Sequence, residues 1–191
     1  MPGVDIFDSM LATAQQYFGN YPDSVKGNFH RFLRNHALFR IHPETEILDK
    51  KTCYAHFLIE DAQAMYQINV SSLDKAITES YDYDEDRLTD LVNWTARSAK
   101  FIVKPDYSYM EQLVAITKRL HLNLYPDSNG QWIFTKIQIK DIIDPNAFTG
   151  CNMELKAGKN FHNKLTQNLI YCEDTPIGDI WFSLLPKGET K

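Results

Sequence analysis

The sequence has little of the residues that mark disordered, fibrous or disulfide-rich chains. Its 191 residues include only 8 Gly, 8 Pro and 3 Cys. This composition excludes a collagen-like, low-complexity or disulfide-scaffold protein. The three cysteines are Cys53, Cys151 and Cys172. Their number is odd, and no two of them have the short spacing of a metal-binding pair. We therefore expect three reduced thiols and a cytoplasmic location.

Long apolar runs are also missing. No stretch approaches the roughly 18 apolar residues of a membrane-spanning helix. The first residues lack the basic and apolar regions of a secretion signal. We therefore expect no membrane insertion. The net charge of −5 argues against a nucleic-acid partner, because phosphate contacts need clustered cations.

The usual motifs of catalysis, metal binding and nucleotide binding are absent from the sequence. The six histidines form no HExxH pattern, no nucleophile elbow surrounds a serine, and the glycines never cluster into a phosphate-binding loop. The acidic run 82–86 begins like a calcium loop, but Arg87 and Asn93 stand where that loop needs Gly and Glu. We therefore predict no cofactor and no metal, and interpret the run as a solvated helix N-terminus.

What the sequence does contain is enough apolar material for a folded core. Apolar residues make up 43% of it and aromatic residues 13%. A strand-turn-strand pattern runs from Leu120 to Ile139. Leu122 and Leu124 alternate with polar residues, a turn cluster fills 125–130, and the segment that follows is rich in β-branched and aromatic residues. This pattern predicts a hairpin.

Helices and further strands surround this hairpin. Apolar residues recur at helical spacing in five segments, which predict helices over residues 4–18, 22–36, 71–77, 88–101 and 108–120. Alternating or β-rich segments predict strands over residues 37–41, 52–59, 64–70, 169–172 and 179–185. Residues 145–163, which are rich in Gly and Asn, predict a long loop.

These elements predict an α+β fold. We expect an antiparallel β-sheet of about five or more strands, built from hairpins, with helices packed against it. The expected organisation is a single α+β domain over residues 1–191, with an N-terminal helical segment at about 4–36 and a frayed tail at 186–191.

Basic residues cluster around the second predicted helix. Arg31 and Arg34 share a helix face, and Arg40 follows them. They form a solvated helix face, a site for an anion or acidic peptide, or a nucleic-acid contact. Trp132 and Trp181 begin predicted strands and serve either as core residues or as interface anchors. These five residues are the protein-binding residues that the sequence predicts.

The leading functional hypothesis is a non-catalytic, acidic adaptor or chaperone-like subunit that binds a partner polypeptide by a sheet edge or an aromatic groove. The first alternative is a motif-poor enzyme or small-ligand-binding protein with a pocket between helices and sheet. Its polar groups would include His56, Arg40 and Asp179. The second alternative is an inhibitor protein of viral or pathogen origin. The sequence leaves the oligomeric state open.

Overall fold

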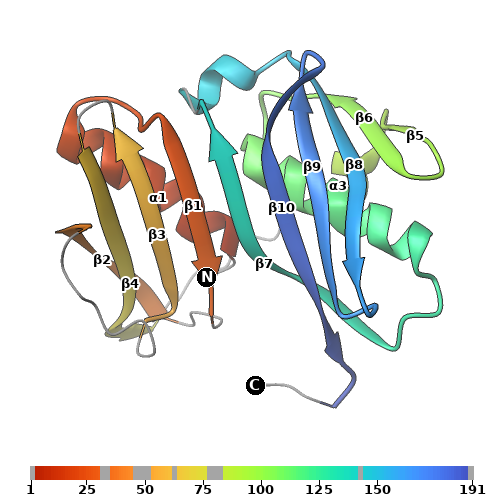
Figure 1. Ribbon diagram of the computed structural model, residues 1–191, viewed down its shortest axis with the longest axis horizontal. Coiled ribbons are helices and arrows are strands. Elements are labelled where there is room, and N and C mark those ends of the chain that lie inside the picture. Colours follow the sequence, from red (N-terminus) through yellow and green to blue (C-terminus); the bar gives the residue numbers. More distant parts are fainter. Residues whose placement is uncertain are drawn as a thin grey trace. The chain divides into compact units, whose positions relative to one another are not determined.

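The computed structural model describes residues 3–30, 35–44, 53–61, 64–76, 84–141 and 144–188. In this part of the chain, three α-helices pack against ten antiparallel strands, which confirms the predicted α+β class. The strands are hydrogen-bonded in the order β2-β4-β3-β1-β7-β10-β9-β8-β6-β5. The chain divides into two compact units, which are described in turn (Figure 1).

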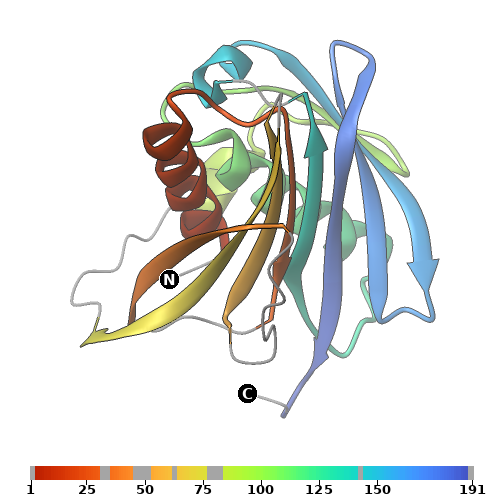
Figure 2. The same ribbon diagram turned by 60° about the vertical axis from the view of Figure 1, so that its left-hand side comes forward.

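Unit 1 comprises residues 1–83 and 136–144. It contains α1 (Gly3–Phe18), β1 (Ser24–Phe29), β2 (Asn35–Pro43), β3 (Ala55–Asp61), β4 (Ala64–Ala76) and the second half of β7 (Gly130–Lys140). All of its paired strands run antiparallel. Figure 2 shows α1, in dark red, on one face of the curved strands.

The predicted N-terminal helix is present, and it begins one residue earlier than predicted, because its apolar residues recur on one face. Phe7, Met10 and Leu11 are all at most 1% exposed, and the ring of Phe7 meets Phe57 of β3 edge-on. Gly19 ends the helix with a left-handed φ of 82°, and its N–H donates to the carbonyl of Gln15.

The second predicted helix is wrong for residues 24–29, which form β1. This strand pairs with β3 on one side and with β7 on the other. Val25 points into the core with alternate residues of its neighbours, so tertiary pairing overrides the helical spacing that the sequence suggested. Residues 31–34 of that prediction lie outside the described residues.

The predicted hairpin at 52–59 and 64–70 is confirmed by the pairing of β3 with β4. However, β4 continues to Ala76, so the helix predicted at 71–77 is wrong for its described part. Ser71, the first residue of that predicted helix, instead lies opposite Leu38 of β2.

Unit 2 comprises residues 84–135 and 145–191. It contains α2 (Glu85–Thr89), β5 (Asn93–Trp94), β6 (Ser98–Ile102), α3 (Tyr109–Leu124), the first half of β7, a 3-10 helix (Pro145–Phe148), β8 (Asn152–Phe161), β9 (Leu165–Cys172) and β10 (Thr175–Pro186). The pairing of β9 with β10 confirms the strand pair predicted near the C-terminus.

The long helix α3 begins where the sequence predicts. The Ser108 hydroxyl accepts from the Glu111 N–H, and the Glu111 carboxylate accepts from the Ser108 N–H, at 3.0 and 2.8 Å. This reciprocal capping box satisfies two N–H groups that a helix leaves unpaired. The helix runs on to Leu124, so the strand predicted around Leu122 is wrong, whereas β7 confirms the second strand of that hairpin.

Two other predictions in unit 2 are wrong. The helix expected over 88–101 ends at Thr89 and gives way to β5 and β6. The loop expected over 145–163 contains β8, which pairs with β6 and β9. Asp84, within the acidic run, caps α2 by accepting from the N–H groups of Asp86 and Arg87.

The remaining predictions concern the whole chain. Of the predicted frayed tail, residues 189–191 lie outside the described residues, and β10 reaches Pro186. The single-domain organisation stays a prediction. Among the described helices, none is long and apolar enough to cross a membrane.

Candidate functional site

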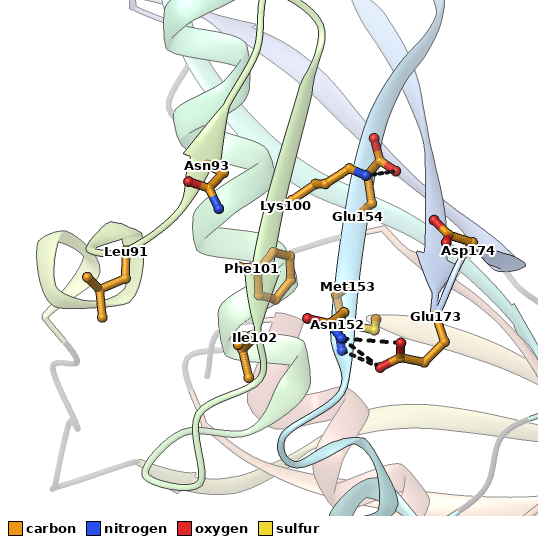
Figure 3. Close-up of a pocket in the computed structure, with 10 residues that line it drawn as sticks. All are labelled: Leu91, Asn93, Lys100, Phe101, Ile102, Asn152, Met153, Glu154, Glu173 and Asp174. Carbon is orange, nitrogen blue, oxygen red and sulfur yellow. Dashed lines mark hydrogen bonds and ion pairs between the residues drawn. The ribbon is translucent and has the colours of Figure 1, made fainter.

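A hollow of about 350 Å³ opens on the strands of unit 2 (Figure 3). Its walls come from β5, β6, β8, the segment after α2 and the turn between β9 and β10. The lining residues are Leu91, Asn93, Lys100, Phe101, Ile102, Asn152, Met153, Glu154, Glu173 and Asp174. The first sequence alternative expected a pocket between helices and sheet, whereas this hollow is built by strands and turns.

One wall holds a carboxylate between two ammonium groups. Lys100 of β6 lies directly opposite Glu154 of β8 in the strand register. Glu154 Oε2 lies 3.5 Å from Lys100 Nζ and 3.3 Å from Lys156 Nζ, and its side chain is 10% exposed. Burial raises the pKa of Glu154, but the hydrogen bond from Lys156 and the two positive charges together bring it below its usual value. Glu154 is therefore ionised at neutral pH and holds Lys100 in place.

The opposite wall is the turn between β9 and β10. Glu173 and Asp174 both have left-handed backbone, with φ of 47° and 65°, as the tight turn of a hairpin requires. The Glu173 carboxylate accepts from the backbone N–H of Asn152 at 2.7 Å and from its side-chain amide at 3.2 Å. The backbone hydrogen bond, and then the side-chain one, lower the pKa of Glu173. The turn is thus tied to the start of β8.

The rim of the hollow is apolar. Phe101 and Met153 are buried below it, whereas Ile102 is 59% exposed and Leu91 is 90% exposed. Leu91 also has a left-handed φ of 63°, a conformation that costs an ordinary residue about 1–2 kcal/mol. A leucine held exposed in this conformation contributes nothing to the core, so its apolar surface is available to a ligand.

Together these walls suit an amphipathic ligand. The Lys100 ammonium and the amide of Asn93 offer hydrogen-bond donors, and the rim offers apolar contact. The Asp174 carboxylate can accept a proton from a water molecule. Among the described residues, no group of three or more His, Cys, Asp or Glu side chains is placed to hold a metal ion.

A second polar cluster lies between α3 and β9. His121 Nε2 is 2.6 Å from the Thr166 hydroxyl and 3.4 Å from the Asn168 amide, and the imidazole stacks on Trp132 at 4.7 Å. Burial lowers the pKa of His121 to about 4, against a smaller opposing effect of a hydrogen bond with the backbone of Thr117. The imidazole is 1% exposed. This neutral, enclosed cluster holds the helix on the sheet and does not face solvent.

The residues predicted to bind a protein have different surroundings. Arg40 is exposed on β2, with its guanidinium 3.5 Å from the Ser71 hydroxyl. Trp132 is 3% exposed, and its indole N–H donates to the Ser128 hydroxyl. Trp181 is half-buried and stacks on a neighbouring ring. Arg31 and Arg34 lie outside the described residues, and the protein-binding role of all five residues stays a prediction.

The polar groups named for the first alternative do not line the hollow. His56 is buried on β3, where its Nε2 lies 3.0 Å from Gln67 Oε1. Asp179 on β10 accepts from the indole N–H of Trp181. Arg40 is the exposed residue on β2 already described.

Sequence reasoning missed the residues that line the hollow. Lys100 fell within a predicted helix, and Glu154 fell within the predicted loop. A signal was present, because Met153, Leu155 and Ala157 alternate with polar residues, which is the period of a strand. The flanking Gly and Asn residues obscured it.

No protein-family model matches the chain, and no curated protein matches it. Solved structures do. A tesB protein of Mycobacterium avium subs paratuberculosis is 10% identical with a TM-score of 0.53, over 97% of this chain and 88% of that one. A bifunctional dehydratase-cyclase domain of ambruticin biosynthesis is 13% identical with a TM-score of 0.48, over 97% and 82%. A protein assigned as an oleoyl thioesterase, from Lactobacillus plantarum, is 12% identical with a TM-score of 0.41, over 92% and 80%.

These comparisons correct the leading functional hypothesis. The M. avium tesB protein shares the fold of this chain, and the leading hypothesis of a non-catalytic adaptor or chaperone-like subunit is corrected accordingly. The alternative of a motif-poor enzyme fits the findings better. The chain has the hot-dog-like α+β fold of the M. avium tesB protein.

Proposed function

We propose that the chain is an enzyme that hydrolyses a thioester between an acyl group and a small thiol, with the hollow of unit 2 as its substrate site. The observation that supports this most is the fold shared with the tesB protein over 97% of the chain. Fold by itself does not specify chemistry, so the proposal also draws on the side chains of the hollow.

The substrate lies across the hollow with its apolar part on the rim. Leu91 and Ile102 contact the acyl chain, since their exposed surfaces would otherwise face water. The Lys100 ammonium donates to the thioester carbonyl oxygen. Its position is maintained by the ion pair with Glu154, so little reorganisation is needed when negative charge develops on that oxygen.

Hydrolysis then needs a water molecule and a proton acceptor. In the proposed reaction, the Asp174 carboxylate takes a proton from water as the water oxygen bonds to the carbonyl carbon. The tetrahedral oxyanion is stabilised by Lys100. When the carbon–sulfur bond breaks, the leaving thiolate takes a proton from Asp174, and the products are a free acid and a free thiol.

The test is the release of thiol from purified protein supplied with a series of acyl thioesters. We expect Lys100→Met and Asp174→Asn to lower kcat/KM about 100-fold, which is the usual effect of removing an oxyanion donor or a general base. Lys159→Met and Asp127→Asn are matched controls, because both residues are exposed in unit 2 and do not line the hollow. Equal activity of all four variants would refute the site, and no hydrolysis of any thioester would refute the function.

We extend the proposal to the location of the protein and to nucleic-acid binding. We propose a cytoplasmic location, which the three unpaired cysteines support, and no nucleic-acid partner, which the acidic composition supports. Labelling of all three thiols in freshly lysed, denatured cells tests the first. We propose no protein partner, because that expectation depended on the adaptor hypothesis.

A further inference from the structure

Two of the three cysteines lie together beside the hollow. Cys172 is the last residue of β9 and lies opposite Met153 of β8 in the strand register. Cys151 comes just before β8, two residues from Met153, so the alternation of strand side chains places it on the same face as Cys172. The two cysteines are therefore diagonal neighbours where the pairing of β8 with β9 ends.

The two thiols contact each other. Burial, and then the neighbouring Cys151 thiol by its charge and by a hydrogen bond, raise the pKa of Cys172 to about 11. Cys151 Sγ also donates to the carbonyl oxygen of Ala147 at 3.3 Å. Both cysteines are half-buried, so a small oxidant can reach them. Two reduced thiols in contact and within reach of solvent are the starting point for a disulfide.

This thiol pair adjoins the wall that carries the proposed proton acceptor. Cys151 is followed by Asn152, and Cys172 by Glu173. Asn152 and Glu173 are joined by the hydrogen bonds that tie the β9–β10 turn to the start of β8 (Figure 3). The Glu173 N–H also donates to the Asn152 carbonyl at 2.9 Å. Asp174 is the next residue, so a bond between the two sulfurs acts within two residues of the proposed chemistry.

We propose that Cys151 and Cys172 form a reversible disulfide, with hydrogen peroxide as the oxidant, and that this bond switches the hollow from an active to an inactive state. The inference rests on the proposed function and adds its regulation. A sulfur–sulfur bond is only about 2 Å long, so its formation draws Cys151 toward β9 and away from the Ala147 carbonyl. Asn152 moves with Cys151, and the turn that carries Asp174 loses its anchor.

The reaction takes two electrons from the thiols and reduces one hydrogen peroxide. Cys172 keeps its proton at neutral pH because its pKa is raised, so Cys151 reacts first. Cys151 gives up its proton, and its sulfur takes a hydroxyl group from the peroxide to form a sulfenic acid. The displaced hydroxide and that proton form water. The Cys172 sulfur then bonds to the Cys151 sulfur, and its proton leaves with the sulfenic hydroxyl as a second water.

The experiment compares the reduced protein with protein treated with hydrogen peroxide. Peptide mass spectrometry should identify a Cys151–Cys172 cross-link that dithiothreitol removes. We expect kcat/KM for thioesters to fall tenfold or more and to recover on reduction, since displacing a positioned group by about 1 Å can cost about 100-fold. Hydrogen exchange of the Asn152 amide, followed by NMR, should accelerate because its N–H loses the Glu173 carboxylate.

Cysteine variants assign the effect to this pair. Cys151→Ser and Cys172→Ser should form no cross-link and should keep their activity after peroxide treatment. Cys53→Ala is the matched control, because Cys53 is buried in unit 1 and does not line the hollow. It should form the cross-link and lose activity as the parent protein does.

Three results would overturn the inference: no cross-link between Cys151 and Cys172, a cross-link that leaves exchange of the Asn152 amide unchanged, or a cross-link that leaves the kcat/KM of an active protein unchanged. If the reduced protein hydrolyses no thioester, the proposed function fails by itself. The cross-link and the exchange of Asn152 do not depend on turnover, so they still decide the inference and the two failures are distinguishable.

Discussion

At the scale of single residues, His121 couples stability to pH. Burial lowers its pKa from 6.5 to about 4, so the folded state binds this proton less readily than the unfolded state does. The unfolded chain therefore gains a proton first as the pH falls. Stability due to the neutral imidazole is fully present above pH 6.5, declines as the pH falls from 6.5 to about 4, and has been lost below that.

We expect the free energy of unfolding to fall by about 3 kcal/mol over this window because of His121 alone. The measurement is urea unfolding at a series of pH values. His121→Gln should remove this part of the pH dependence, even if it lowers stability at every pH. His162→Asn is the matched control, since this exposed histidine has a left-handed φ that Asn also accepts. If the free energy of unfolding of both variants depends on pH as steeply as that of the parent protein, His121 is not the cause of the pH dependence.

At the scale of elements, β1 depends on the absence of a side chain at Gly27. A Cβ placed there would lie 2.6 Å from Cε1 of Phe57, on the neighbouring strand. Phe57 is fully buried, and its ring also meets Phe7 and Phe29. The ring therefore cannot move aside without disturbing the core, and we expect Gly27→Ala to destabilise the protein by about 1–3 kcal/mol.

A double-mutant cycle identifies the cause. Phe57→Leu removes the ring atoms that the new methyl group would meet, so Gly27→Ala should cost at least about 1 kcal/mol less in that background. Denaturant midpoints of the four proteins give the coupling. Additive effects would show that strand conformation at Gly27, and not contact with Phe57, sets the cost.

The same strand shows why part of the fold could not be predicted. Helical spacing at 22–36 was real, but two neighbouring strands, distant in sequence, supply hydrogen bonds that local propensity does not represent. By contrast, α3 was predictable because its signal is local: the Ser108–Glu111 box and an apolar face. A local signal therefore predicted α3 correctly because no distant strand competes for its hydrogen bonds, whereas the helical spacing in β1 was overridden by its two neighbouring strands.

The hollow was unpredictable for a related reason. Lys100 and Glu154 are 54 positions apart in the sequence, and only the pairing of β6 with β8 places them opposite each other. Acidic and basic residues assembled from separate strands leave no linear motif. The alternation around Met153 could have revealed the strand but not its neighbour.

At the scale of the whole molecule, β7 links the stability of the two units. Residues 136–140 belong to unit 1 and pair with β1, whereas residues 130–135 belong to unit 2. Within unit 2, the hydroxyl of Thr135 donates to the Trp181 carbonyl on β10. Unfolding of either unit would leave half of β7 without its strand partners, which should destabilise the other half of β7. We therefore expect one cooperative unfolding transition, in line with the single domain that the sequence predicts.

The positions of the tryptophans make this testable. Trp94, Trp132 and Trp181 all belong to unit 2, so fluorescence reports on that unit, whereas far-UV circular dichroism reports on both. Gly27→Ala perturbs unit 1, and Ser108→Ala removes the α3 cap in unit 2 at a cost of about 1 kcal/mol. Each variant should shift the fluorescence and dichroism midpoints together. A fluorescence midpoint that Gly27→Ala leaves unmoved, with a broadened dichroism transition, would mean that the units unfold separately and that the chain contains two domains.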